Sequence, residues 1–333
     1  MRQSLPQNLT RDDTLALKGV AILLMILHHV LIADFYDKPS TVLSTSLMYK
    51  LSLVGKFCVG IYTFVIGYGY AFAARHDAAY AFKHIINLLV RFWPLCIGFF
   101  ILGLVNGFQL ELSTVALNLF GLRMDYNCAS WFVYFYIFSM ISLPFLAKLI
   151  DRWGLKALLV VILLSGIICF FLHKNENAFY TAFVVCMKYC PVLAIGYFVA
   201  KTDWAFVKHQ FSTLELLLIV LLMIAASGVA MMVMGFCTYT FITPVFALAF
   251  AMLLKHPVIG SVKPILIKLG KVSLYMWFIH AVFFSDMTRS IFQQSALWPD
   301  NPLLVYLLVA SVSFLVACLL MRIERLVVQQ CKH

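Results

Sequence analysis

The sequence predicts an all-α membrane protein, a polytopic bundle of about ten transmembrane helices. Hydrophobic residues make up 63% of the 333 residues and charged residues only 12%, whereas a soluble protein carries about 25% charged residues. Mean hydropathy is +0.96, and the apolar residues form runs of about 20, the length of helix that crosses a bilayer. These observations exclude a soluble globular enzyme and a disordered chain.

Ten apolar runs are long enough to span a membrane. They cover residues 15–35, 52–74, 84–106, 128–150, 155–173, 179–200, 213–234, 237–255, 270–291 and 302–322. Helices are predicted because each backbone group must be paired within the hydrocarbon, and because the runs lack the alternating pattern of a membrane barrel. With no long linker between runs, residues 1–333 are expected to form a single membrane domain without an appended soluble domain.

The distribution of Lys and Arg predicts the orientation. With a cytoplasmic N-terminus, inside segments hold 16 of the 25 Lys and Arg residues and outside segments hold 5. Such an excess is typical of cytoplasmic loops, so both termini are expected in the cytoplasm, and the net charge of +11 does not indicate a nucleic-acid partner. The remaining four cations fall within spans: Lys18, Lys56, Arg91 and Lys188.

The cysteines do not indicate a metal or disulfide site. Nine are present, and most lie inside apolar runs, where cysteine behaves as a small hydrophobic residue. Cys186 and Cys190 share a helix face, but no second pair with metal-ligand spacing accompanies them. No metal is therefore expected.

Charged or titratable residues inside a span are costly unless they are paired or hydrated, so they are candidates for function. In the first span, Lys18 and His29 are eleven residues apart, which places them on one helix face about 16 Å apart, while His28 points about 100° away. Neutral imidazole is a common general base near neutral pH. The alternatives are a lysine that extends to the membrane surface and a hydrogen-bonded core histidine.

Two further spans carry polar residues. Ser273 and His280 are seven residues apart and share a face of the ninth span with Trp277 between them. Such a pair could bind a ligand or simply join two helices by hydrogen bonds. In the third span, Arg91 could bind an anionic ligand or anchor the end of the helix.

Together these residues resemble the motifs of the integral-membrane acyltransferase 3 family. Lys18 and His29 match its opening pattern of a basic residue, ten residues and a histidine. The other matching stretches are Phe64 to Gly69, Arg91 to Pro94, Ser130 to Val133 and Leu269 to His280. Two features differ, because the family often has an arginine where Leu88 stands and an acid shortly after the Trp-Phe pair, where this chain has none.

The resemblance implies an acyl-CoA-dependent O-acyltransferase of the bacterial cytoplasmic (inner) membrane. The acyl group, most often acetyl, would move from cytosolic acyl-CoA to a hydroxyl of a surface glycan or lipid-linked saccharide. A basic inner face suits the phosphates of the cosubstrate, and the expected contacts are Lys18, Arg91 and Lys83. His29 is the expected catalytic residue, as a general base by preference or as a covalent acyl carrier. The expected acceptor contacts are Arg123, Trp131, Ser273, Trp277 and His280.

A multi-span transporter or flippase of lipid-linked sugar is the alternative function. Ten spans and intramembrane histidines suit proton coupling. Against it, the sequence shows no internal repeat of the kind found in many transporters, and Asp34 and Glu215 are the acids nearest to or within the predicted spans. Membrane lipid is an expected partner under either function.

Overall fold

The computed structural model describes residues 9–32, 45–109, 111–172, 177–202, 210–233, 235–285, 288, 299 and 301–330. Throughout these ranges the secondary structure is helical and contains no strand, which confirms the predicted fold class. Residues 33–35, 173, 234 and 286–291 of the predicted spans, and the cations Lys38, Lys174 and Arg289 of the predicted outside segments, lie outside the described residues.

The helices follow one another with short connections. They are α1 (Arg11–Leu31), α2 (Thr45–Gly55), α3 (Cys58–Ala71), α4 (Ala78–Val105), α5 (Leu112–Leu119), α6 (Trp131–Trp153), α7 (Leu155–Phe171), α8 (Ala178–Lys201), α10 (Thr213–Val233), α11 (Gly235–Cys237), the π-helix η2 (Thr238–Ile242), α12 (Thr243–Leu253), α13 (Pro257–Gly260), α14 (Lys263–Ile279), the 3₁₀ turn η3 (His280–Phe283) and α16 (Pro302–Gln330).

Nine helices among the described residues are long and apolar enough to cross a membrane. The remaining predicted span corresponds to α7, whose 17 residues are at the short end of the range for a spanning helix. The second predicted span is a broken helix, because α2 ends at Gly55 and α3 begins at Cys58. The count of about ten therefore agrees with the structure once α7 is included.

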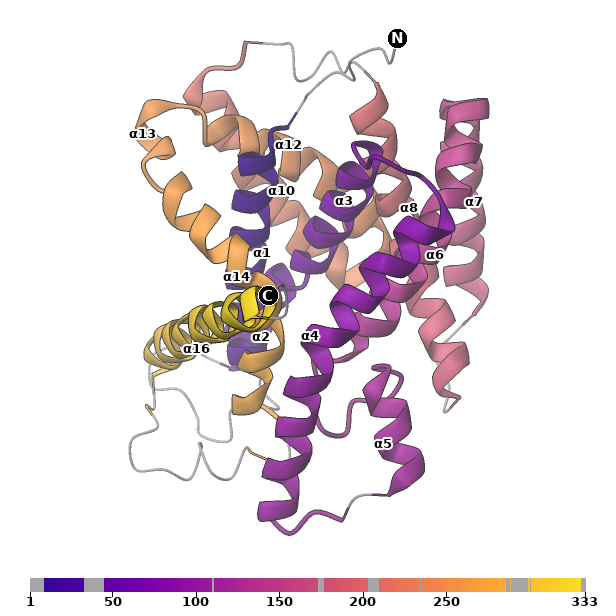
Figure 1. Cartoon of the computed structure of the whole chain (residues 1–333). Coiled ribbons are helices and arrows are strands. Elements are labelled where there is room, and N and C mark those ends of the chain that lie inside the picture. Colours follow the sequence, from indigo (N-terminus) through magenta and orange to yellow (C-terminus); the bar gives the residue numbers. More distant parts are fainter. Residues whose placement is uncertain are drawn as a thin grey trace.

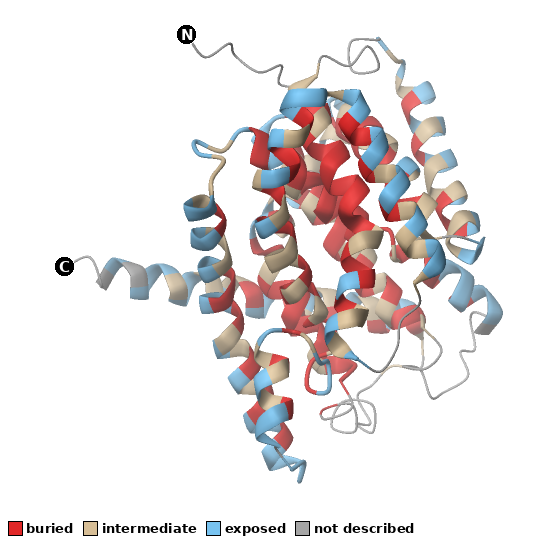
Figure 2. Cartoon of the chain, turned by 90° about the vertical axis from the view of Figure 1, so that its right-hand side faces the viewer, coloured by how far each residue is buried: buried red, intermediate tan, exposed pale blue. Residues whose placement is uncertain are grey.

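Most of the long helices run along one common direction, but α16 lies across them (Figure 1). Figure 2 shows the same crossing from the side, with the C-terminal part of α16 projecting away from the bundle. The helix also continues to Gln330, eight residues beyond the predicted span. That both termini share one side of the membrane stays a prediction.

The outward surface of the bundle is apolar. Buried residues gather inside, whereas the outer faces of the helices are exposed (Figure 2). On α7, for example, Leu163, Phe170 and Phe171 are each more than 60% exposed. A surface of this kind suits lipid rather than water as the surrounding solvent.

Helices α1 and α14 form the most extensive helix contact of the structure. They cross at two glycines, since a Cβ on Gly19 would lie 2.1 Å from the backbone oxygen of Leu266, and one on Gly270 would lie 1.9 Å from that of Leu15. Small residues allow membrane helices to approach in this way. The first turns are also joined, because Lys263 Nζ lies 2.6 Å from Oδ1 of the fully buried Asp13. The two helices therefore run parallel and in a fixed register.

Candidate active site: a histidine pair and a basic cavity

Two histidines from distant parts of the chain meet near the ends of α1 and α14. Nδ1 of His29 lies 2.7 Å from Nε2 of His280, and the rings stack with their centroids 4.9 Å apart. His280 is fully buried and His29 is partly buried. The structure thus brings together the two histidines that sequence analysis selected separately.

His28 has a different environment from its neighbour. Its Nδ1 lies 2.8 Å from the backbone oxygen of Ser52 in α2, and its side chain is buried. This contact fits a structural role in joining α1 to α2. The predicted difference in direction between the two adjacent histidines is confirmed.

The hydrogen bonds of the pair define where the protons lie. Nδ1 of His280 is 3.1 Å from the backbone oxygen of Met276, and a carbonyl oxygen can only accept, so this nitrogen carries a proton. In the neutral ring, Nε2 of His280 then has a lone pair and accepts from Nδ1 of His29. It follows that the lone pair of neutral His29 is on Nε2.

A cavity of about 580 Å³ opens beside α1, α4 and α14, toward the end of the bundle where these helices begin. Five cations line it, together with His84: Arg11, Lys18, Arg91, Lys271 and Arg325. The described lining contains no carboxylate, and of these five cations Arg91 alone has a described carboxylate within ion-pair distance. We refer to this space as the basic cavity.

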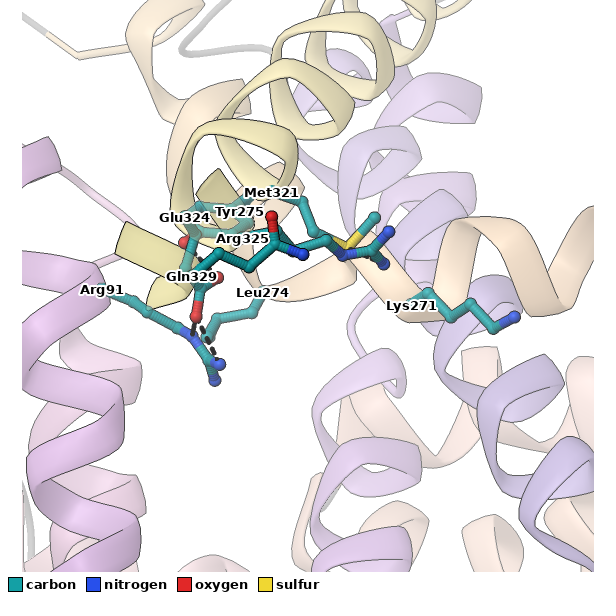
Figure 3. Close-up of a pocket in the computed structure, with 8 residues that line it drawn as sticks. All are labelled: Arg91, Lys271, Leu274, Tyr275, Met321, Glu324, Arg325 and Gln329. Atoms are coloured by element: carbon teal, nitrogen blue, oxygen red, sulfur yellow. Dashed lines mark hydrogen bonds and ion pairs between the residues drawn. The ribbon is translucent and has the colours of Figure 1, made fainter. Parts of the chain in front are cut away.

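Arg91 is paired with an acid from the crossing helix. Its Nε and Nη2 donate to Oε1 of Glu324 at 2.8 and 2.7 Å, and the hydroxyl of Tyr275 donates to Oε2 at 2.8 Å. Figure 3 shows this arrangement in an adjoining cavity of about 430 Å³, which shares Arg91, Lys271 and Arg325 with the basic cavity. Glu324 lies beyond the end of the predicted tenth span, so sequence analysis did not count it among the acids within spans.

Aromatic side chains close the inner end of the basic cavity. The Trp277 ring packs 4.4 Å from Phe132 and 5.1 Å from Tyr62, measured between centroids, and its Nε1 donates to the backbone oxygen of Ala129 at 2.9 Å. All three rings line the cavity. His280 follows Trp277 by three residues, about 4.5 Å of helix rise, so the histidine pair lies about one turn beyond the cavity wall.

The remaining predicted site residues are spread over several places. Ser273 lines the basic cavity and donates to the backbone oxygen of Gly270 at 3.0 Å. Lys83 is exposed and outside the described lining, which contains His84 instead. Trp131 lines a second cavity, described below. The cations that sequence analysis did not select are Arg11, Lys271 and Arg325.

Arg123 belongs to a surface ion pair between α5 and α6. Its Nη2 lies 2.8 Å from Oδ1 of Asp125, and the arginine side chain is 47% exposed. Partial burial raises the pKa of Asp125, but hydrogen bonds from Asn118 and Arg123 outweigh this effect, and the pKa remains below its ordinary value. The pair helps to hold the loop that leads into α6.

The fold and the site define a polytopic helical membrane protein with a basic cavity and an intramembrane histidine pair. A family model described as an acyltransferase domain matches residues 16–322, and the chain belongs to this family of membrane acyltransferases. No curated protein matches the sequence. No solved structure matches it either.

Proposed function

We propose that the protein transfers an acyl group, acetyl by preference, from cytosolic acyl-CoA to a hydroxyl of a surface glycan or lipid-linked saccharide. One observation carries the proposal. The basic cavity gathers five cations and no described carboxylate in its lining, and it ends about one helical turn from the His29–His280 pair. A long anionic donor with its reactive group at one end fits such a shape.

The cations are arranged to hold phosphate groups. Arg11 and Lys18 come from α1, Lys271 from α14 and Arg325 from α16, so they surround the cavity from three helices. Charge-assisted bonds to phosphate are stronger than neutral ones. With the phosphates near the wide end, the thioester would point toward Trp277 and the histidine pair.

His29 supplies the base in this proposal. The lone pair on its Nε2 takes the proton of the acceptor hydroxyl, and the hydroxyl oxygen attacks the thioester carbonyl. The carbon–sulfur bond then breaks, and the departing thiolate receives the proton from His29 as free CoA. The products are the acyl ester and the CoA thiol, and His29 returns to its starting form.

The orientation follows from the charges. The basic cavity lies at the end of the bundle that holds Arg11 and the start of α4, which the excess of Lys and Arg predicts to be cytoplasmic. The acceptor would approach His29 from the opposite end. A bacterial cytoplasmic membrane is the location that suits a cytosolic donor and a surface acceptor.

The test is binding of acetyl-CoA and release of its thiol by the purified protein in lipid nanodiscs. Wild-type protein is expected to bind acetyl-CoA and to release the thiol above the buffer rate, slowly with water and faster with cell-envelope saccharide. His29→Asn should bind the donor but release no thiol above that rate. Absence of acetyl-CoA binding by the wild type would contradict the proposal.

A further inference from the structure

A second and larger cavity lies at the other end of the bundle. Its volume is about 1030 Å³, and it is enclosed by the start of α6, the end of α7, the first half of α8 and α11. None of its described lining residues belongs to the basic cavity. The mechanism above does not use this space.

Lys188 is the one charged residue in the described lining of this cavity. It lies ten residues, about 15 Å, from the first residue of α8, within a helix long and apolar enough to span the membrane. An ionisable residue at that depth is expensive and is expected to serve a function. Lys188 is also the intramembrane cation farthest along the chain, and the donor site does not include it.

The surroundings of Lys188 are built to hold its ammonium group in the cavity. The group lies 5.3 Å from the centre of the Tyr239 ring, a favourable cation–π distance. A Cβ on Gly235 would come within 2.9 Å of Nζ, so the absence of a side chain there leaves room for the lysine. Tyr239 itself is in the π-helix η2, an irregularity that often occurs at functional sites.

An apolar groove leads from this cavity to the lipid-facing surface. The groove has a volume of about 360 Å³ and is lined by apolar residues and glycine of α7 together with Phe236. Gly166, Phe170 and Phe236 line both spaces, so the groove and the cavity are continuous. Phe170 is 67% exposed, which places the groove at the hydrocarbon of the membrane.

The inner wall of this cavity adjoins the donor site. Trp131 lines the cavity and stacks on Tyr189 with centroids 6.0 Å apart. On its other side Trp131 packs edge-on against Trp277 at 6.2 Å, and Trp277 lines the basic cavity. The two spaces are therefore separated by a layer of aromatic side chains.

We infer that this cavity and groove bind the acceptor as an anionic amphiphile, a lipid-linked saccharide whose phosphate contacts Lys188 and whose chain lies against α7. The inference rests on the proposed function, because it assigns the acceptor of the same reaction. The charge of Lys188 complements a phosphate, and the apolar groove complements a hydrocarbon chain. The aromatic wall at Trp131 suits a sugar ring and brings it toward the donor.

Farnesyl phosphate and farnesol are suitable probes, because they share a chain and differ only in the phosphate. Binding of tritiated farnesyl phosphate is measured by scintillation proximity on protein in nanodiscs, with farnesol as competitor. Wild-type protein should prefer the phosphate by ten-fold or more. Lys188→Met should bind it about 10- to 100-fold more weakly, the loss expected for a charge-assisted bond, whereas Lys188→Arg should retain most of the affinity.

Two matched pairs separate the site from general effects on the membrane domain. Lys156→Met, at the far end of α7, should leave binding unchanged. Gly166→Leu should fill the junction of groove and cavity and weaken both probes, whereas Gly166→Ala should not, since its Cβ would lie at an ordinary contact distance of 3.6 Å from the Phe236 ring.

Acetyl-CoA binding is measured on every variant. Unchanged donor binding together with the losses above supports the inference. Equal affinity of the wild type for farnesyl phosphate and farnesol overturns it, whether or not acetyl-CoA binds. Absence of acetyl-CoA binding with intact phosphate preference would instead contradict the proposed donor and leave the amphiphile site in place.

Discussion

His29 and His280 each follow, by ten residues, the glycine at which their helices cross. Gly19 and Gly270 set that crossing, because each approaches the backbone of the other helix more closely than a Cβ would allow. Two parallel helices that meet at one level also bring residues ten positions further on to a common level, about 15 Å away. The 2.7 Å contact between the imidazoles is therefore a consequence of how α1 packs on α14.

This packing makes Gly270 sensitive to substitution. In Gly270→Ala, the new Cβ would lie 1.9 Å from the backbone oxygen of Leu15, so α14 must move away from α1 at a cost of about 1–3 kcal/mol. We expect a lower thermal midpoint and reduced acyl transfer. Gly98→Ala is the matched control, because nothing lies within 4 Å of the added carbon. Equal stability of the two variants would show that the crossing tolerates separation.

The adjacent histidines allow a second prediction. Asparagine places its amide nitrogen near the position of imidazole Nδ1, so His29→Asn can still donate to His280 but lacks the base. Acyl transfer should fall by about 10²–10⁴-fold at normal protein abundance. His28→Asn can still donate to Ser52 and should remain active in the same CoA-release assay. Full activity of both variants would exclude histidine base catalysis in α1.

His280 is predicted to act as a positioning residue through its acceptor nitrogen. In His280→Gln the amide oxygen can accept from His29 Nδ1, whereas His280→Asn can donate to Met276 but does not reach His29. We expect the Gln variant to retain most of kcat and the Asn variant to lose about ten-fold or more. The pH dependence of kcat should shift in the Asn variant alone. Equal losses without a change in pH profile would indicate a purely structural contact.

The spans and the first-helix pattern could be predicted from sequence because both depend on local spacing. The beginning of α14 could not be placed correctly, since the polar residues Lys263 and Lys268 resemble a loop. Pro264 in its first turn was the available signal, because proline is favoured at the start of a helix. As a result, Lys271 lies within the helix and lines the basic cavity rather than ending a cytoplasmic segment.

Contacts between distant helices were beyond sequence reasoning. Arg91 and Glu324 are 233 positions apart, and no local pattern indicates that a helix crossing the bundle would bring them together. The same holds for Arg325 and for the pairing of His29 with His280, although each histidine could be chosen as a candidate by its depth in a span. Position along one helix can be read locally, whereas the partner depends on packing.

Introduced cysteines test the predicted orientation. Ser113→Cys in α5 and Ser261→Cys before α14 are exposed positions at opposite ends of the bundle. In intact cells, a membrane-impermeant maleimide should label the first and not the second, with the other cysteines replaced to remove background. Labelling of Ser261→Cys alone would place the basic cavity outside the cell, away from cytosolic acyl-CoA.

The Arg91–Glu324 pair yields the prediction that best separates donor binding from helix anchoring. If Arg91 binds a donor phosphate, Arg91→Ala should raise the KM for acetyl-CoA about 10- to 100-fold and leave the acceptor KM nearly unchanged. Arg91→Lys should restore part of the loss, because a point charge remains but the planar fork is gone.

Glu324→Gln is the informative partner variant. The carboxylate now occupies the guanidinium at 2.7 Å, in competition with any phosphate, so its neutralisation should lower the KM for acetyl-CoA. Tyr275 can still donate to the amide oxygen, which keeps that end of α16 attached to α14. If Glu324 instead serves to orient Arg91 for the donor, Glu324→Gln will raise the KM as Arg91→Ala does. Steady-state kinetics of the two variants, with thermal midpoints as the check on folding, decides between a competing anion and a supporting one.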